Sequence, residues 1–187
     1  RELVVSTYQA AGGSGQKGII ELLTQTNEVL HNKPININHF PKQLAFNLIP
    51  QIDQFADLDY TREEWKMINE TKKILALPSI DITATCVRVP VMIGHAVSVF
   101  ARFNKSIDIN RARNVLQTFD GIALIDDPSK QKYVTPIDAA HQDKVFVSRL
   151  RKHPSIDNAL SFWCVADNLR KGAALNAIQI AQAISMI

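Results

Sequence analysis

Apolar and polar residues alternate in several short runs of the chain, which is typical of β-strands with two differently used faces. The run at residues 82–89 is the clearest, because threonines and valines at odd positions alternate with Ala84, Cys86 and Arg88. Residues 159–166 are so apolar that we expect a strand buried on both faces. The predicted strands cover residues 3–8, 44–49, 82–89, 95–103, 122–125, 145–151 and 159–166.

Apolar residues spaced three and four apart predict the helices. Thr61 and Glu64 form a capping box at the start of one helix, and Thr135 followed by Pro136 begins a brief one. A last helix starts near Asn168 and carries a stripe of small apolar residues. The other helices are expected over residues 15–30, 61–75, 109–119 and 135–140.

Strands joined largely in series, with helices between them, predict an α+β domain. We expect one mixed, largely antiparallel sheet with helices on one face. The other sheet face, or the apolar stripe of the final helix, then needs a partner.

Composition excludes several classes of protein. The 187 residues suit one domain, or one domain with a piece of another. A net charge of +3 without a basic stripe argues against a nucleic-acid partner. No apolar run is long enough to cross a membrane, so we expect a cytoplasmic location. Cys86 and Cys164 lack metal-ligand spacing, which predicts buried thiols and no metal site. Because the chain begins at Arg1 inside a strand-like run, we expect a fragment or a processed piece.

Arg88 and His95 are the most chemically suggestive residues, because they lie seven positions apart in an otherwise apolar run. In apolar surroundings an arginine grips a carboxylate or phosphate with two hydrogen bonds. A histidine beside it transfers protons near neutral pH. The alternative is an ion-paired arginine and a hydrogen-bonded core histidine, and these two residues alone favour that alternative.

Three further segments each allow two interpretations. Gly12, Gly13 and Gly15 precede a helix and suit a tight turn better than a phosphate cradle. Glu63 and Lys66 share a helix face that is either solvated or directed at a zwitterionic ligand. Arg170 and Lys171 stand at the unfavourable positive end of the last helix, where a bound anion or simple exposure to solvent explains them.

Seven segments in order along the chain resemble the carboxy-terminal part of aspartate-semialdehyde dehydrogenases, of the shorter bacterial type. Because the match runs from end to end, it is more specific than any single motif. The segments are STYQA at 6–10, AFNLIP at 45–50, EEWK at 63–66, NETKKI at 69–74, ATCVRVP at 84–90 and on to His95, PIDAA at 136–140, and DNLRKGAA at 167–174.

The resemblance implies a glyceraldehyde-3-phosphate-dehydrogenase-like fold and NADP-dependent interconversion of aspartyl phosphate and aspartate semialdehyde, with phosphate as the other partner. That reaction leads to lysine, methionine and threonine. By the same resemblance Gln9 orients the intermediate and His95 is the acid/base. The implied substrate contacts are Arg88 with the carboxylate, Glu63 with the amino group and Lys66 with phosphate. Asn168 then contacts the nicotinamide carboxamide.

One departure from the family is decisive. The family's nucleophilic cysteine lies a little under thirty residues before the glutamine, whereas only eight residues precede Gln9. Cys86 and Cys164 occupy other positions and do not replace it. We therefore expect this chain alone to be inactive.

The resemblance also divides the chain. We expect a catalytic and dimerisation domain over residues 1–169, which forms a homodimer, and a terminal helix over 170–187 that packs on an absent NADP-binding domain. Two alternatives stay open. One is an acetylglutamyl-phosphate reductase-like domain, against which the charged helix from Glu63 to Lys73 argues, and the other is a non-catalytic dimerising or anion-binding module.

Overall fold

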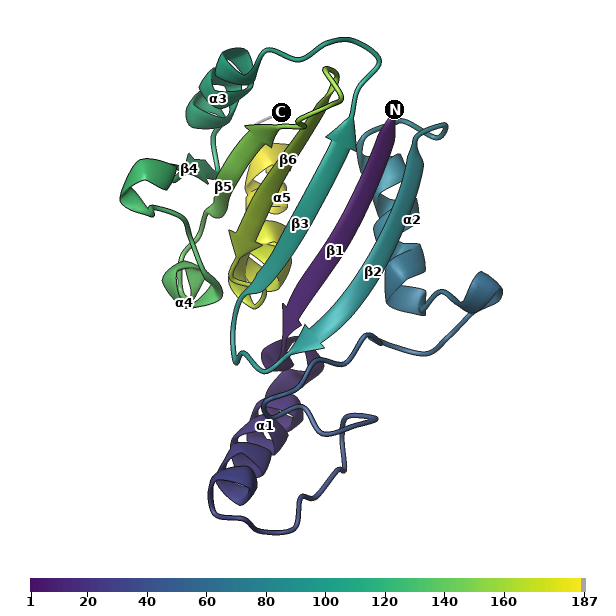
Figure 1. The fold of residues 1–187 in the computed structure, drawn as a ribbon, viewed down its shortest axis with the longest axis vertical. Coiled ribbons are helices and arrows are strands. Elements are labelled where there is room, and N and C mark those ends of the chain that lie inside the picture. Colours follow the sequence, from purple (N-terminus) through teal and green to yellow (C-terminus); the bar gives the residue numbers. More distant parts are fainter. Residues whose placement is uncertain (186–187) are drawn as a thin grey trace.

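Six strands form one mixed sheet in a computed structural model that describes residues 1–185 (Figure 1). The order across the sheet is β2-β1-β3-β6-β5-β4. The two outer pairs, β1 with β2 and β4 with β5, are parallel, and the three inner pairs are antiparallel. The strands are β1 (Glu2–Ala10), β2 (Asp81–Val89), β3 (His95–Arg102), β4 (Ile122–Leu124), β5 (Val145–Lys152) and β6 (Ala159–Ala166).

Helix α2 packs against β2, and α5 lies on the same side of the sheet but has no buried residue, so it does not cover the strands (Figure 1). Helix α1 continues beyond the end of β1, while α3 and α4 lie near β4 and β5. This confirms the predicted α+β class with a largely antiparallel sheet. The helices are α1 (Gly15–Leu30), α2 (Arg62–Ile74), α3 (Ile109–Thr118), α4 (Pro136–Ala139) and α5 (Leu175–Ser185).

The two sheet faces differ in what covers them. On the helix face, Met67 of α2 packs on a cluster that includes Val5, Ala84 and Val99. Strand alternation and register place Ser6, Thr85, Ser98 and Trp163 on the opposite face, which we call the open face. The segment around α4 packs there, where Ala139 joins a small cluster with Ala96 and Val165.

Helix α2 is fixed at its start in the predicted way. Thr61 accepts from the Glu64 backbone, and the Glu64 carboxylate accepts from the Thr61 backbone at 2.7 Å. The other Glu64 carboxylate oxygen accepts from the Cys86 backbone N–H at 2.9 Å. One carboxylate therefore begins α2 and also ties it to β2.

The strand predicted over residues 44–49 is wrong, because these residues form an irregular segment with one isolated bridge, from Ile49 to Arg88. The Gln25 side chain accepts hydrogen bonds from the backbone N–H groups of Leu44 and Ala45. Phe46 has a φ of 57°, which a strand does not allow. Gln25 of α1 thus supplies the acceptor that a neighbouring strand would have supplied.

Two expectations about the last part of the chain need correction. Strand β6 is only half-buried at Ser161–Cys164. No helix of the described residues covers Ser161 and Trp163 on the open face, and Phe162 on the other face lines a hollow. The last helix becomes regular only at Leu175, after a wider turn over Arg170–Ala174. Residues 186 and 187 of the predicted terminal helix lie outside the described residues.

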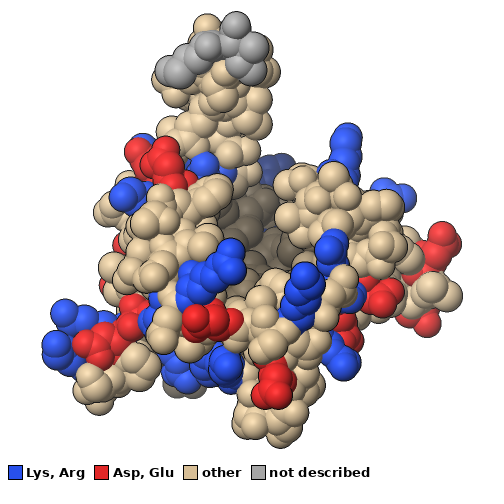
Figure 2. Space-filling view, turned by 90° about the horizontal axis from the view of Figure 1, so that it is seen from above, with Lys and Arg blue, Asp and Glu red and all other residues tan. Residues whose placement is uncertain are grey.

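Helix α5 leaves apolar surface uncovered, since Ile178 and Ile184 are exposed. A hollow of about 450 Å³ lies between α3 and the sheet and is lined mainly by apolar side chains, among them Phe103, Leu160 and Phe162. Figure 2 shows the molecule hollowed beside the column that α5 forms. None of the helices within residues 1–185 is long and apolar enough to span a membrane.

Candidate active site

All six residues predicted for the site line one pocket of about 460 Å³. Parallel strands β1 and β2 both end here with Gln9 and Arg88, and antiparallel β3 begins here with His95. Helix α2 adds Glu63 and Lys66. Asn168 follows the end of β6 and completes the pocket wall. The topology therefore brings together residues that are up to 159 positions apart in the sequence.

The backbone of Ala10 holds both central side chains. Its carbonyl oxygen accepts from Nη1 of Arg88 at 2.7 Å, and its N–H donates to Nδ1 of His95 at 3.1 Å. Arg88 pairs with Gln9 in β1, and Ala96, which follows His95, pairs with Tyr8 in β1, so the sheet register brings both side chains to Ala10. One residue without a functional side chain thereby orients a cation and an imidazole.

Arg88 is a buried cation without a carboxylate partner among residues 1–185. Its side chain is 7% exposed, and its guanidinium carbon lies 5.9 Å from the centre of the Phe40 ring. Burial lowers the pKa of Arg88, and the charge of Glu63 acts in the opposite direction. A guanidinium with remaining donors in such surroundings is suited to bind an anionic group with two hydrogen bonds.

His95 is neutral at physiological pH. Burial, followed by the nearby Arg88 charge, lowers its pKa from 6.5 to about 4. Because Nδ1 accepts from the Ala10 N–H, the proton of the neutral ring lies on Nε2. His95 therefore offers a hydrogen-bond donor to the pocket.

Gly13 makes room for that donor. A Cβ atom at this position would lie 2.7 Å from Nε2 of His95 and 3.0 Å from Nη1 of Arg88. Gly94, which precedes His95, has a φ of +100°, and a Cβ atom there would lie 2.9 Å from Pro136. Gly13 and Gly94 therefore allow close packing around His95, a role that the sequence did not predict.

Glu63, Lys66 and Gln9 form a hydrogen-bonded group on the α2 side of the pocket. Lys66 donates to one Glu63 carboxylate oxygen at 3.1 Å, and Nε2 of Gln9 donates to the other at 3.2 Å. The contact with Glu63 raises the pKa of Lys66. A carboxylate and an ammonium group thus stand together, as a zwitterionic ligand requires.

Asn168 and Asp167 fix the far wall of the pocket. The Asn168 side-chain oxygen accepts from the Gly94 N–H at 2.8 Å, which leaves its amide N–H groups for other partners. Burial alone would raise the pKa of Asp167, but hydrogen bonds from the backbones of His141, Arg170 and Leu169 lower it. Asp167 was not predicted, although an aspartate directly before a helix start is a known capping signal.

Arg170 has a protein partner, because it forms an ion pair with Asp143 at 2.6 Å. Lys171 donates to the side chain of Gln179. These contacts account for two cations at the start of the last helix without a bound anion.

Neither thiol serves the pocket. Cys86 is fully buried, and burial raises its pKa to about 11. Cys164 is half-buried, which corrects the expectation of a second buried thiol, and burial raises its pKa to about 12. Both thiols are unbonded and stay protonated at neutral pH, so they do not act as nucleophiles in this state.

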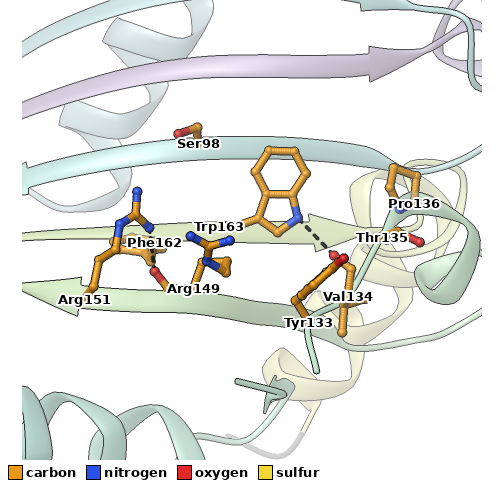
Figure 3. A pocket seen from close by; sticks show the side chains of 9 residues that line it. All are labelled: Ser98, Tyr133, Val134, Thr135, Pro136, Arg149, Arg151, Phe162 and Trp163. Atoms are coloured by element: carbon orange, nitrogen blue, oxygen red, sulfur yellow. Dashed lines mark hydrogen bonds between the residues drawn. The ribbon is translucent and has the colours of Figure 1, made fainter. Parts of the chain in front are cut away.

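A second pocket of about 360 Å³ lies on the open face, and no motif in the sequence predicted it. Figure 3 shows the Arg149 guanidinium beside Trp163, whose indole nitrogen donates to Val134, and Arg151 farther along the strand beside Phe162. Neither guanidinium lies within 4.0 Å of a carboxylate in the part of the chain that the structure describes. Uncovered cations beside aromatic rings are typical of protein interfaces.

Comparison with known proteins identifies the family of the chain. Residues 1–171 match the family model described as semialdehyde dehydrogenase, dimerisation domain. The aspartate-semialdehyde dehydrogenase of Bacillus subtilis is 43% identical over 194 aligned residues, which span the whole chain and 56% of that protein.

Solved structures of aspartate-semialdehyde dehydrogenases are also similar to this chain. Aspartate semialdehyde dehydrogenase II from Vibrio cholerae, in a complex with ASA, has a TM-score of 0.94 and 44% identity, covering 99% of this chain and 55% of that one. The enzyme from Candida albicans with NADP has a TM-score of 0.69 at 22% identity, covering 98% of this chain and 50% of that one. The latter likeness shows the fold alone.

The chain spans about half the length of the relatives it matches. Its relatives are aspartate-semialdehyde dehydrogenases, so the acetylglutamyl-phosphate reductase alternative is not favoured. The chain therefore belongs to the aspartate-semialdehyde dehydrogenase family, in which it corresponds to the carboxy-terminal, dimerisation domain.

Proposed function

We propose that the chain supplies the substrate-binding and proton-handling residues of an NADP-dependent aspartate-semialdehyde dehydrogenase. The reaction is the reductive dephosphorylation of aspartyl phosphate, on the route to lysine, methionine and threonine. The observation that carries this proposal is the meeting of Gln9, Glu63, Lys66, Arg88 and His95 in one pocket. The family of the relatives supports it.

The charges of the pocket suit this substrate. Arg88 has donors for the substrate carboxylate and forms no ion pair within residues 1–185, although Glu63 is close enough to act on its pKa. Glu63 can accept from the substrate amino group while it shares its oxygens with Gln9 and Lys66. Lys66, whose side chain is 58% exposed, reaches the open side where a phosphate enters. Each end of a zwitterionic phosphorylated substrate then meets the opposite charge.

His95 handles the reacting oxygen. Its Nε2–H points to the part of the pocket where Gly13 leaves space, and it donates a hydrogen bond to an oxygen that gains negative charge. Burial next to Arg88 keeps the ring neutral, since its pKa is lowered to about 4. As the substrate changes charge at this oxygen, the same nitrogen is the atom at which a proton is held or moved.

Asn168 fits a contact with the nicotinamide carboxamide. Its oxygen is occupied by the Gly94 N–H, so its amide N–H groups remain for a carbonyl oxygen of the cofactor. NADP, when bound, accepts or supplies the hydride. Asn168 of this chain then helps to orient the nicotinamide ring.

We propose that the rest of the protein, which the relatives' length implies, supplies the nucleophilic cysteine and most of the NADP site. Residues 1–169 then act as the catalytic and dimerisation domain. The segment from 170 onward, of which 186 and 187 are outside the described residues, packs on the other domain. Exposed Ile178 and Ile184 and the apolar hollow beside α5 are the surfaces available for this contact.

A homodimer that forms through the open face is part of the proposal. This face carries half-buried Tyr8, Phe100 and Trp163 without a covering layer of helices, and it holds the pocket with Arg149 and Arg151. Aromatic residues and arginines are enriched in interfaces. We place the assembled enzyme in the cytoplasm.

The test is to complete the protein and measure its activity. The chain is produced alone and as the carboxy-terminal half of a full-length enzyme, completed with the amino-terminal half of the Vibrio cholerae relative. We expect phosphate-dependent reduction of NADP by aspartate semialdehyde in the complete protein and none in the chain alone. A folded, dimeric complete protein without this activity would favour a non-catalytic dimerising or anion-binding module.

A further inference from the structure

Thr7 is a buried polar residue that the proposed mechanism does not use. It lies two positions before Gln9 in β1, so both side chains point to the same sheet face. Its residue is 2% exposed, and its hydroxyl oxygen lies 3.3 Å from Nε2 of Gln9. A buried hydroxyl in contact with a pocket residue calls for an explanation.

The contacts of Gln9 fix which end of its amide faces the protein. Nε2 donates to a Glu63 carboxylate oxygen at 3.2 Å and to the Thr7 hydroxyl at 3.3 Å. A carboxylate only accepts hydrogen bonds, so the NH₂ end of the amide must face Glu63. An amide nitrogen carries two hydrogens, and both are therefore taken by the protein.

Only the carbonyl oxygen of Gln9 is left for a ligand. This oxygen has no hydrogen-bond partner among the described residues. Every fully buried side-chain oxygen or nitrogen of those residues does have a partner, so Oε1 is not fully buried. The Oε1 atom is consequently accessible, and Gln9 lines the pocket beside Arg88 and His95. Gln9 thus presents a hydrogen-bond acceptor where its two neighbours present donors.

We propose that Thr7 is a positioning residue, which together with Glu63 locks the Gln9 amide so that Oε1 accepts a hydrogen bond from the reacting group. The reacting group is then a hydroxyl, such as that of the tetrahedral adduct of the aldehyde, and not a bare carbonyl. The proposal rests on the proposed function, because it concerns the same pocket. Its tests separate the two.

The central test is a set of variants of the complete enzyme. Thr7→Val keeps the shape of the side chain and removes the acceptor, whereas Thr7→Ser keeps the hydroxyl. We expect kcat to fall about five- to tenfold in Thr7→Val and to stay within about twofold in Thr7→Ser, since one hydrogen bond is lost only in the first. KM for phosphate should not change.

A double-mutant cycle distinguishes positioning from a general structural effect. If Thr7 acts only through Gln9, Thr7→Val should have no further effect on kcat in a Gln9→Ala background. An equal loss in both backgrounds, or wild-type kcat in Thr7→Val, overturns the proposal. Thr118→Val is the matched control, because its hydroxyl is hydrogen-bonded within α3 and does not line the pocket. It should leave kcat unchanged.

A second measurement does not depend on turnover. In the ¹⁵N-labelled complete protein, the Gln9 side-chain amide protons should exchange slowly with water, and Thr7→Val should speed the exchange of one of them at least fivefold. If the Gln9 amide protons exchange equally fast in wild type and Thr7→Val, the proposed role of Thr7 is wrong, even if the enzyme is active. Altered exchange in a protein without dehydrogenase activity would instead support the lock and reject the proposed function.

Discussion

At the scale of single residues, the site depends on the backbone of Ala10 as much as on charged side chains. Arg88 and His95 bind its carbonyl oxygen and its N–H, respectively. A peptide group does not change its charge with pH, so both side chains are held in one geometry in every protonation state of the ligand.

Arg88→Lys should weaken substrate use more than turnover. Lysine keeps the charge but not the planar pair of donors, so one charge-assisted hydrogen bond to the substrate carboxylate is lost. We expect KM for aspartate semialdehyde to rise about tenfold in the complete enzyme, with kcat within about threefold. Arg62→Lys, at the exposed start of α2, is the control. Equal kinetics of Arg88→Lys and wild type would remove Arg88 from carboxylate binding.

His95 should make the stability of the fold depend on pH. Its pKa of about 4 in the folded protein is below the ordinary value of 6.5, because of burial and the Arg88 charge, although Glu63 and Asp167 oppose this shift. The unfolded chain therefore binds more protons between these two values, and stability falls as pH is lowered from about 6.5 to about 4. The neutral ring should contribute about 1–3 kcal/mol above this range.

Urea unfolding of wild type and His95→Gln at several pH values measures this contribution. The variant should lose less stability than wild type between pH 7 and pH 4, since glutamine does not titrate. The same pH dependence in both proteins would contradict a lowered pKa of His95.

Some site residues were predictable from the sequence, because charged or titratable side chains are unusual among apolar residues or stand out at the start of a helix. Arg88 and His95 lie in an otherwise apolar run of the sequence, and Glu63 and Lys66 lie at the start of a capped helix. Thr7 and Ala10 were not predictable in this way. Their roles depend on which strands are neighbours, and small or weakly polar residues in a strand carry no sign of it.

At the scale of elements, Glu64 links two parts of the site. It caps α2, which carries Glu63 and Lys66, and it also accepts from the Cys86 N–H of β2, the strand of Arg88. Thr61→Ala should lower the free energy of unfolding by about 1 kcal/mol through loss of the cap. Glu64→Ala should cost about 2 kcal/mol or more, because two buried N–H groups lose their acceptor.

Asp108→Ala provides the matched control for this comparison. Asp108 caps α3 through the Asn110 N–H, and within residues 1–185 its carboxylate accepts no hydrogen bond from a strand. Chemical denaturation should rank Asp108→Ala with Thr61→Ala and below Glu64→Ala. If all three variants cost the same, Glu64 does no more than cap a helix.

The irregular segment at residues 44–49 shows why an apolar pattern alone does not predict a strand. Its apolar residues do enter a core, since Leu44, Ala45 and Ile49 are buried. The pattern reports burial, however, and not which group accepts the backbone hydrogen bonds. Here the acceptor is the side chain of Gln25, nineteen and twenty residues away, which is not visible in a local window.

At the scale of the whole molecule, the fold class followed from the strand and helix periods, whereas the strand order did not. Strand β1 lies between β2 and β3, which are separated from it by more than seventy residues. This order alone brings the ends of β1 and β2 to the start of β3. The pocket is thus a consequence of topology, and only the resemblance to a family anticipated that its six residues would meet.

The open face leads to the last prediction. Ser98 lies in the central strand β3 between Ser6 and Trp163, and it lines the open-face pocket that also holds Arg149 and Arg151. Ser98→Lys adds a charge that water can solvate in a single copy but that a second copy would bury. Sedimentation of the complete protein should therefore give a dimer for wild type and a monomer for Ser98→Lys at micromolar concentration. Thr24→Lys, on the exposed side of α1, should stay dimeric. A dimeric Ser98→Lys protein would show that the open face is not the interface, and it would direct attention to the exposed isoleucines of α5.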